Sequence, residues 1–524
     1  MKESNKKLKV DLLENGMINE VFPKYINTNG LSKIKFGSIK NNGNKGSSPA
    51  TINLLKNDGN NRIISIPNPV SYFQLVNDIF EKEKILEELV EKIQNNKFSH
   101  SKILTDDNEF NIPIKGFKSN YEKSRREKMF ISIGMKYRLK YDIEKFYDSI
   151  YTHYIPAGLL GYEKALEYYE NDDKNERYKY MVKIDKDMRN LCNAETKGII
   201  TGPFTSRIFS ELLQSEIDNE ITGAINNDKF RRYVDDTEIY ISSLEESEKE
   251  IEIIKRIFQK YKLFLKIEKT EIKKIPYIDF DSLCEIINIR RKKNNEKKGW
   301  YFASQDDLFV TLEKAEKLCT SKSKGPIKYI LKVLGSKNYE YGIDNGFKIK
   351  DKSFLYILNY LLKYPQYSKE IINIIDKQII YVDEAETIIN NTLKLFIEEL
   401  QHIPCLYLID TMANNKLKIN ENIIFDFLNN HSCDNEILKA TMIKILCINN
   451  KDNKYKKILT FEKEKMKNKG KINFQKSNWM SKYVLYYHNI IEDDEIEDND
   501  FYQRFKLFKT NNIKFVDLKD VTIS

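Results

Sequence analysis

The chain has 524 residues, of which 41% are hydrophobic and 31% are charged. This length exceeds one ordinary hydrophobic core, so we expect two or three domains, and the hydrophobic content excludes a wholly disordered chain. The 87 Lys and Arg residues outnumber the 78 Asp and Glu residues, which leaves a net charge of +9. This excess suits a polyanionic partner, but it is small for the length and identifies no function by itself.

Cysteine, histidine and hydropathy patterns exclude several other classes. The six cysteines contain no Cys-x-x-Cys pair, and the five histidines lack metal-ligand spacing. No window approaches the roughly 18 apolar residues of a membrane span, and the N-terminus is polar and rich in lysine. We therefore expect a cytoplasmic protein with no membrane partner.

The first 60 residues mix short apolar runs with Asn, Gly and Ser, and residues 41–49 are predicted to form a loop. Further on, residues 73–96 carry apolar side chains at helical spacing, which predicts one helix or a broken pair. Residues 157–197 also have a helical pattern.

The segment 137–147 alternates apolar or aromatic residues with polar ones, which predicts a strand with Asp142 near its end. A glycine-bearing loop at 198–207 follows and leads into a predicted helix. We expect a loop of this kind, at the start of a helix, to suit contact with a nucleotide.

Residues 231–240 place Asp235 and Asp236 between two β-prone segments, which predicts a hairpin that presents both carboxylates. Two Mg²⁺ ions about 3.5–4 Å apart can hold the attacking and leaving oxygens of a phosphoryl displacement, and such hard cations prefer carboxylate ligands. Asp142 is the expected third ligand. The Tyr-x-Asp-Asp string alone arises by chance in roughly one such sequence in ten, so the surrounding segments must support the assignment.

A further short strand or turn at 264–270 carries Lys269. The basic residues between 290 and 298 either contact a nucleic-acid backbone or keep a linker solvated. After Trp300, apolar residues recur at helical spacing in serial segments without a clean repeat. Such helices must bury their apolar faces on neighbours, which predicts an all-α array or an irregular bundle.

The Asp142 strand, the Gly202 loop, the Asp235 hairpin and the Lys269 turn, in this order, resemble the palm of a reverse transcriptase. The similarity extends to the abortive-infection (AbiK/AbiA-type) reverse transcriptases of bacterial phage defence. Three further segments carry it: residues 62–72, residues 151–156 (Tyr-Thr-His-Tyr-Ile-Pro) and the Thr-Gly-x-x-x-Ser-Arg loop at 201–207.

This resemblance covers roughly residues 60 to 280, and it implies an α+β fold of fingers and palm at 61–290. It also implies an all-α, HEAT-like helical domain at 300–524, for which a generic helical bundle is the alternative. Residues 1–60 are then an N-terminal segment that is partly loop.

Asp142 and Asp235 are expected to bridge two Mg²⁺ ions, with Asp236 as an outer ligand and the Ile143 carbonyl assisting. Mn²⁺ is an alternative metal. A structural role for Asp142, as the cap of the following helix, is the competing interpretation.

The nucleotide site is expected to use five further residues. Tyr147 stands where the family places an aromatic ring against the sugar 2′ position, so we expect it to exclude ribonucleotides, with core packing as the alternative. Gly202 and Ser206 are expected to line the incoming nucleotide. Lys269 and Arg62 are candidate phosphate contacts, although both are compatible with plain surface roles.

The loop departs from ordinary templated reverse transcriptases, which usually have glutamine at the position of Thr201 and proline at that of Arg207. This departure favours the abortive-infection branch, whose members resemble terminal polymerases that extend DNA from a protein hydroxyl without a template. A tyrosine phenol is then the primer. Tyr25 is the candidate, because it is the only tyrosine before Tyr72 and its segment is expected to be mobile.

Three functions follow from these patterns. The first is a phage-defence DNA polymerase that uses deoxynucleoside triphosphates to make single-stranded DNA attached to the protein, without a template. An RNA-templated reverse transcriptase of the retron or group II intron kind is the second. The third is a helical scaffold with a nucleotide-binding palm. Family resemblance also implies a homo-oligomer.

Overall fold

The computed structural model describes residues 2–35, 46–56, 59–101, 103–105, 109–115, 121–171, 175–225, 228–275, 293–294, 297–298, 305–319, 324–335, 351–376, 379, 382, 384–431, 435–519 and 521–524. Several sequence-based expectations fall outside these residues: part of the predicted loop (41–45), part of the basic run (290–292), Trp300, Cys284 and Cys433.

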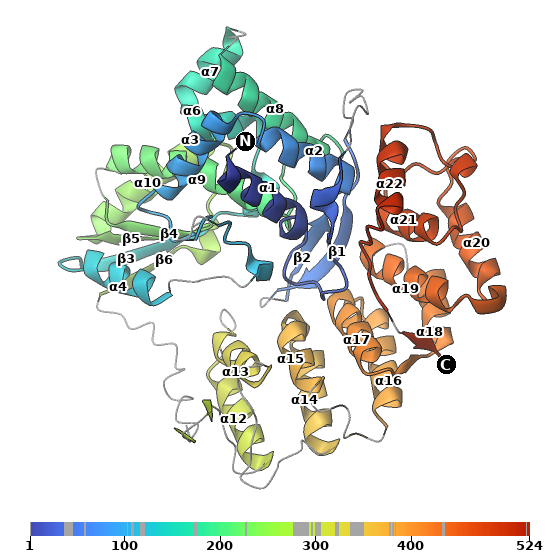
Figure 1. Cartoon of the computed structure of the whole chain (residues 1–524). Helices are drawn as coiled ribbons and strands as arrows, with labels where there is room; N and C mark the ends of the chain where they lie inside the picture. Colours follow the sequence, from blue (N-terminus) through green and yellow to red (C-terminus); the bar gives the residue numbers. More distant parts are fainter. Residues whose placement is uncertain are drawn as a thin grey trace.

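A four-stranded antiparallel sheet, with the strand order β4-β5-β3-β6, lies in the region predicted to be the palm, and this name is kept for it below. Its strands are β3 (Tyr137–Tyr141), β4 (Phe230–Tyr233), β5 (Asp236–Ile241) and β6 (Glu271–Lys274). Helices α9 (Phe204–Ile225) and α10 (Leu244–Lys260) cover one face, and α4 (Tyr121–Ile131) lies on the other side (Figure 1). The sheet therefore brings the segments before and after α9 side by side.

Alternation of side chains explains why this sheet has two different faces. Leu139 and Ile239 pair across β3 and β5 and are fully buried, as expected for the face that packs on helices. On the other face, Arg138 is 2% exposed and its Nη1 donates to Glu238 at 3.3 Å. Lys128 from α4 reaches the same carboxylate at 3.0 Å, so charged pairs hold α4 to the sheet.

The fingers contain the hairpin β1 (Ala50–Leu55) and β2 (Asn61–Ile66), followed by α2 (Pro69–Ile79) and α3 (Glu83–Gln94). Of the two alternatives predicted for residues 73–96, one helix or a broken pair, the structure has the broken pair. Asn68 caps α2 by accepting a hydrogen bond from the Val70 N–H at 3.1 Å, and Pro69 fits the first helical turn.

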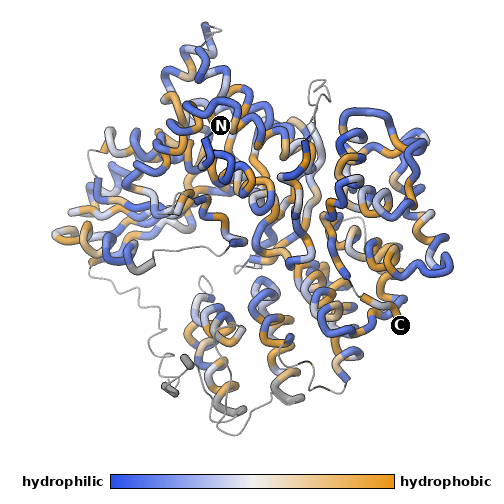
Figure 2. Tube along the Cα trace, viewed as in Figure 1, coloured by the Kyte–Doolittle hydropathy of each residue, from blue (hydrophilic) through white to orange (hydrophobic). Residues whose placement is uncertain are grey.

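The helical prediction for residues 157–197 is also confirmed. This region contains α6 (Ile155–Leu160), α7 (Tyr162–Glu170) and α8 (Glu176–Asn190), after the short α5 (Phe146–Ser149). Helix α7 projects from the body of the molecule with a hydrophilic tip, whereas hydrophobic stretches concentrate where elements pack together (Figure 2).

The N-terminal segment contributes more than loop. Helix α1 (Glu3–Asn15) buries Leu8, Leu12 and Leu13. Beyond it, Ile26 forms an antiparallel bridge with Val516, and the Asp517 N–H donates to the Tyr25 carbonyl at 2.7 Å. The two ends of the chain are therefore joined through backbone hydrogen bonds.

The C-terminal part is mostly helical. Its helices are α12 (Gln305–Lys317), α13 (Gly325–Gly335), α14 (Asp351–Lys363), α15 (Ser368–Ile375), α16 (Ala385–Glu398), α17 (His402–Asn414), α18 (Glu421–Asp426), α19 (Glu436–Asn449), α20 (Lys456–Lys465), α21 (Trp479–Tyr487) and α22 (Asp500–Thr510). Short strands β9 (Lys418–Ile419) and β10 (Thr522–Ile523) pair in parallel, and β7 (Lys293–Asn294) pairs with β8 (Lys297–Lys298).

These helices pack both on one another and on the fingers. Helix α15 contacts α13 and α14, α17 contacts α16, and α19 contacts α21. Helices α17 and α19 also pack against β1 (Figure 1). The structure is thus a mixed α/β N-terminal part joined to a mostly helical remainder.

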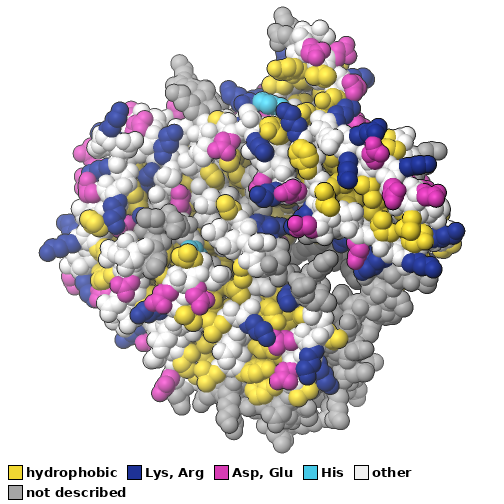
Figure 3. All heavy atoms as spheres, turned by 180° about the vertical axis from the view of Figure 1, so that it is seen from behind, with side chains coloured by type: hydrophobic (Ala, Val, Ile, Leu, Met, Phe, Trp, Pro, Cys, Tyr) yellow, Lys and Arg dark blue, Asp and Glu magenta, His cyan; other side chains and the backbone are white. Residues whose placement is uncertain are grey.

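On the face shown in Figure 3, positive and negative side chains are interspersed and do not gather into one basic surface. This agrees with the small net charge. Within the described ranges, no helix combines the length and the apolar character needed to cross a bilayer.

Candidate active site

The acidic turn joins β4 to β5 through two residues, Val234 and Asp235, because Tyr233 and Asp236 pair directly across the strands. Val234 has a φ of 58°, which is the left-handed region. A β-branched residue rarely adopts this conformation, which costs about 1–3 kcal/mol unless its surroundings enforce it. The turn is therefore held under backbone strain.

Asp142 and Asp235 meet at the end of the palm. Asp142 is 5% exposed, and its carboxyl group is in hydrogen-bonding contact with that of Asp235. Burial, followed by the charge and hydrogen bond of Asp142, raises the pKa of Asp235 to about 7. Two carboxyl groups in this arrangement must share a proton or a cation, because both cannot ionise freely side by side.

Asp236 has a different environment. Its side chain is exposed, and its Oδ1 lies 3.5 Å from Lys140 Nζ. Across the parts of the chain that the structure covers, no three His, Cys, Asp or Glu side chains group closely enough to hold a metal. The structure thus brings Asp142 and Asp235 together and leaves Asp236 beside them on a surface ion pair.

The backbone at Ile143 is oriented by the segment that follows α10. The Lys266 N–H donates to the Asp142 carbonyl and the Glu144 N–H donates to the Phe264 carbonyl, each at 2.8 Å. The backbone on both sides of Ile143 is thus fixed, and the assistance of the Ile143 carbonyl to a metal stays a prediction.

A divalent cation fits this donor set. The two carboxyl groups repel each other when ionised, and a cation would relieve the repulsion that now raises the pKa of Asp235. Water and the oxygens of a bound triphosphate would complete the coordination, as Mg²⁺ usually requires.

Tyr147 lies near this pair. Burial raises its pKa to about 12, while a hydrogen bond with Ser210 and the nearby charge of Arg207 act in the opposite direction. Asp235 contributes to the same shift, which shows that the phenol and the acidic turn share one environment. The Tyr147 phenol therefore stays protonated at neutral pH. Exclusion of ribonucleotides by Tyr147 stays a prediction.

Gly202 makes a contact that requires glycine. Its φ is 146°, and a Cβ built at this position would lie 2.3 Å from the Ser65 carbonyl oxygen on β2. The Ser65 N–H donates to the Thr201 carbonyl at 2.7 Å. The loop is therefore fastened to the fingers hairpin, and no side chain fits between them.

The first turn of α9 contributes a buried serine and a half-buried arginine. Ser206 is 1% exposed, and in the described structure its hydroxyl has no hydrogen-bond partner. Arg207 donates from Nη2 to the Ser101 hydroxyl at 2.9 Å. A buried hydroxyl without a partner is costly, so a polar ligand at Ser206 would be favourable.

The remaining predicted residues lie in varied places. Arg62 is exposed on β2, and Lys269 ends the 3₁₀ turn Ile267–Lys269, with its side chain outside the described structure. Tyr25 is 6% exposed, its hydroxyl lies 3.4 Å from the Leu406 carbonyl, and burial raises its pKa well above the ordinary value. The sequence predicts a mobile segment at Tyr25, whereas in the structure contacts with the C-terminal helices enclose this side chain. Its role as primer stays a prediction.

A network that the sequence did not reveal supports the turn. Arg232 on β4 pairs with Glu211 and Asp218 of α9, and its Nη1 donates to the Val234 carbonyl at 2.8 Å. Arg232 stands next to the acidic motif, but nothing in its local pattern distinguishes it from the exposed arginines of the chain.

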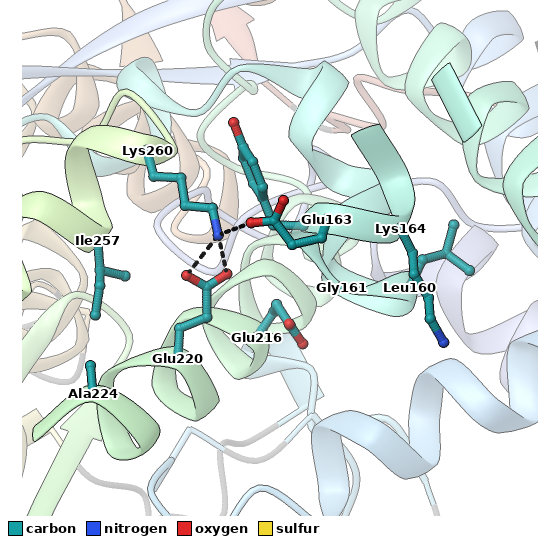
Figure 4. A pocket seen from close by; sticks show the side chains of 10 residues that line it. Leu160, Gly161, Glu163, Lys164, Glu216, Glu220, Ala224, Ile257 and Lys260 are labelled. Carbon is teal, nitrogen blue, oxygen red and sulfur yellow. Dashed lines mark hydrogen bonds and ion pairs between the residues drawn. The ribbon is translucent and has the colours of Figure 1, made fainter. Parts of the chain in front are cut away.

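A cavity of about 450 Å³ lies near the other end of α9 from Ser206 (Figure 4). There, Lys260 Nζ lies 2.9 Å from Glu163 and 3.3 Å from Glu220, so the charges point at one another across the opening. Lys260, Glu163 and Glu220 pair with one another, so we assign none of these charged side chains to the acidic turn.

The sheet, its helices and the paired carboxyl groups define the fold of a polymerase-type nucleotidyltransferase. Residues 54–298 match the family model described as reverse transcriptase (RNA-dependent DNA polymerase). The chain therefore contains a reverse transcriptase domain, which spans slightly less than half of its length. No curated protein matched the sequence.

Solved structures similar to this chain include telomerases of two yeasts. The apo telomerase of Candida tropicalis is 13% identical with a TM-score of 0.31, covering 76% of this chain and 70% of that chain. A form truncated from its C-terminal domain is 15% identical with a TM-score of 0.30, covering 45% of this chain and 52% of that one. Telomerase from Candida albicans in complex with the TWJ fragment of telomeric RNA is 12% identical with a TM-score of 0.31, and the match covers 68% of this chain and 64% of that chain. The chain thus spans between about half and two thirds of the length of most of these telomerases.

Proposed function

We propose that this chain is a metal-dependent DNA polymerase that joins deoxynucleotides through the acidic site at Asp142 and Asp235. The observation that carries the proposal is the contact of these two buried carboxyl groups, whose mutual repulsion a divalent cation would relieve. Reverse transcriptases generally use divalent metal ions such as Mg²⁺. When bound, two such ions stabilise charge on the attacking and leaving oxygens.

The residues of the chain would prepare this site in three ways. Asp142 and Asp235 would present their carboxylate oxygens to the metals. Tyr147 occupies the space beside them with a neutral phenol, which suits exclusion of a 2′ hydroxyl. Ser206 offers an unpaired hydroxyl to the nucleotide, while Arg62 and Lys269 are the proposed phosphate contacts.

The direct test is incorporation of labelled deoxynucleotides by the purified chain in Mg²⁺ or Mn²⁺. We expect Asp142→Asn and Asp235→Asn each to reduce incorporation by at least about a thousandfold, because each removes an anionic ligand from the reacting centre. Full incorporation by Asp235→Asn would refute the mechanism.

We further propose that synthesis is untemplated, begins on a protein hydroxyl and serves phage defence. The support is the resemblance to abortive-infection enzymes and the Thr201 and Arg207 substitutions in the loop. In the structure, Arg207 is directed to Ser101, and Thr201 uses its carbonyl to hold β2. Tyr25 would have to leave its buried site before it could act as primer, so another tyrosine is the better expectation.

Incubation of the chain with Mg²⁺ and deoxynucleotides, without nucleic acid, tests this finer proposal. A nuclease-sensitive increase in protein mass under denaturing conditions would support it, and mass spectrometry of the adduct would identify the priming residue. In cells, loss of phage resistance upon replacement of Asp142, Asp235 and Asp236 by alanine would support the role in defence. Intact resistance would instead favour the helical scaffold as the active part.

A templated reverse transcriptase is the second candidate, favoured by the match to the RNA-dependent family model. Dependence of the product sequence on added or co-purified RNA would select it. For either polymerase, we propose that the mostly helical C-terminal part forms a HEAT-like array and mediates homo-oligomers. Light scattering of the purified chain would test the second of these points.

A further inference from the structure

We propose that Arg232 is a positioning residue that fixes the acidic turn to α9 and so sets where Asp235 meets Asp142. This inference rests on the proposed function, because it concerns the same metal site. Arg232, Glu211 and Asp218 are each 1% exposed, so all three charges are removed from water. Charges buried to this extent persist only where hydrogen bonds satisfy them.

The guanidinium group satisfies several acceptors at once. Nε donates to Asp218 Oδ2 at 3.0 Å, and Nη2 donates to the same oxygen at 2.9 Å. Nη2 also donates to Glu211 Oε2 at 3.1 Å. Nη1 donates to Glu211 Oε1 at 3.3 Å and to the Val234 carbonyl at 2.8 Å. Only the planar fork of arginine can reach two carboxylates and a carbonyl together.

Two carboxylates face one guanidinium, so the network needs additional donors. Asn96 Nδ2 donates to Asp218 at 2.8 Å, and the Ser99 hydroxyl donates to Glu211 at 3.0 Å. Burial would lower the pKa of Arg232, but the charges of Asp218 and Glu211 raise it above its ordinary value. Arg232 therefore remains charged at every pH at which the protein is folded.

Backbone contacts hold Arg232 in place as well. Its N–H donates to the Phe98 carbonyl and its carbonyl accepts from the His100 N–H, each at 2.8 Å. Both the main chain and the side chain of Arg232 are thus fixed before the strand reaches the turn.

The hydrogen bond from Arg232 to the Val234 carbonyl is the contact through which Arg232 acts on the metal site. Val234 is the strained, left-handed residue, and Asp235 follows it directly. Holding the Val234 carbonyl fixes the peptide plane between Val234 and Asp235, which sets the direction in which the Asp235 side chain leaves the turn. Without this bond, Val234 would be free to relax to negative φ and carry Asp235 away from Asp142.

Helix α9 connects the Arg232 network with the residues proposed to bind the nucleotide. The same helix begins at the loop with Gly202 and Ser206, carries Ser210 beside Tyr147, and carries Glu211 and Asp218 beneath the turn. A rigid helix fixes the spacing between these groups. The Arg232 network therefore links the acidic turn to the elements proposed to hold the nucleotide.

The test compares Arg232→Lys with Arg231→Lys in the full chain. Arg231 is the matched control, because it is the adjacent arginine and its partners, the Phe230 carbonyl and the Glu127 carboxylate at 3.9 Å, both lie outside the Arg232 network. Three quantities are measured: the Mn²⁺ affinity by electron paramagnetic resonance, and the kcat and the KM for deoxynucleotide incorporation. A lysine ammonium cannot serve both carboxylates and the Val234 carbonyl.

We expect Arg232→Lys to weaken Mn²⁺ binding and lower kcat by about tenfold to a hundredfold, with a smaller change in the nucleotide KM. Arg231→Lys should keep a Mn²⁺ affinity, a kcat and a KM close to those of the wild type. A folded Arg232→Lys protein with wild-type Mn²⁺ affinity and kcat would overturn the inference.

Glu211→Gln provides a milder variant should Arg232→Lys fail to fold, because Asp218 still pairs with Arg232. The Glu211→Gln substitution weakens one contact of the Arg232 guanidinium and keeps the arginine itself, so we expect a several-fold loss of Mn²⁺ affinity. An unchanged Mn²⁺ affinity would overturn the inference. If the wild-type chain binds Mn²⁺ and Arg232→Lys does not, but neither polymerises, the proposed function fails while the positioning role stands.

Discussion

At the scale of single residues, the site depends on two carboxyl groups that are unfavourable neighbours. A raised folded-state pKa means that the folded protein binds a proton more tightly than the unfolded chain between about pH 4 and pH 7 for Asp235. Without metal, the free energy of unfolding should therefore fall as pH rises through this window.

The first prediction concerns Asp235→Asn at pH 8 in EDTA. The amide removes the repulsion and can donate to Asp142, so we expect a stabilisation of about 1–2 kcal/mol, measured by urea unfolding. Mg²⁺ should raise the Tm of the wild-type protein and leave this variant unchanged. Asp236→Asn is the matched control, because it breaks only an exposed ion pair and should shift stability by about 0–1 kcal/mol. Equal effects of the two substitutions would contradict the prediction.

The second residue-scale prediction concerns sugar selection by Tyr147. Tyr147→Ala should raise incorporation of ribonucleotides relative to deoxynucleotides by about tenfold or more, since it removes bulk from the pocket. Tyr147→Phe keeps the ring and loses only the hydroxyl that pairs with Ser210, so it should retain most of the selectivity. Loss of selectivity in both variants would show that the ring is not the excluding group.

At the scale of elements, the loop before α9 is joined to the fingers hairpin at Gly202. We expect Gly202→Ala to force β2 and the loop apart, because the added Cβ would overlap the Ser65 carbonyl at 2.3 Å. The cost should be about 2 kcal/mol or more in urea unfolding, with reduced nucleotide incorporation.

Gly223→Ala is the control for this substitution, because Gly223 lies on α9, the helix that follows the loop, and a Cβ at that position meets nothing within 4 Å. It should be neutral or slightly stabilising, since alanine favours helix over glycine by about 1 kcal/mol. A stable and fully active Gly202→Ala protein would show that the close approach is not required.

At the scale of the whole molecule, the C-terminal helices and the fingers form one packed body. Asn68 Nδ2 donates to the Phe474 carbonyl at 2.8 Å, across 406 positions of sequence, while its Oδ1 caps α2. Tyr25 and Asp517 join the ends of the chain in the same way. Fingers and helical part should therefore unfold together.

The fourth prediction uses this shared residue. Asn68→Ala loses a helix cap and a buried long-range hydrogen bond, so it should cost about 2–3 kcal/mol. Asn175→Ala, which loses the half-buried cap of α8, should cost about 1 kcal/mol. Two separate unfolding transitions by calorimetry, or equal costs for both variants, would contradict this coupling.

Much of the palm was predictable from sequence because its signals are local. Alternation over 137–147 predicted a strand with Asp142 near its end; β3 occupies Tyr137–Tyr141, directly before Asp142, and α5 begins at Phe146. Adjacent acids between β-prone segments predicted the turn at Asp235. Helical spacing gave the broken helix pair of the fingers and the helical character after residue 300. Each of these depends on neighbours within a few positions, where side-chain periodicity reflects which face is buried.

The sequence by itself therefore determined the palm elements, the acids they carry and the mostly helical remainder. Only the tertiary structure decided that Tyr25 is enclosed, that Arg232 binds Glu211 and Asp218, and that the helices after residue 400 pack on the fingers. The physical reason is that these contacts join residues far apart in the chain. Burial and pairing of a tyrosine or an arginine depend on which distant surface covers it, and no local pattern records that surface.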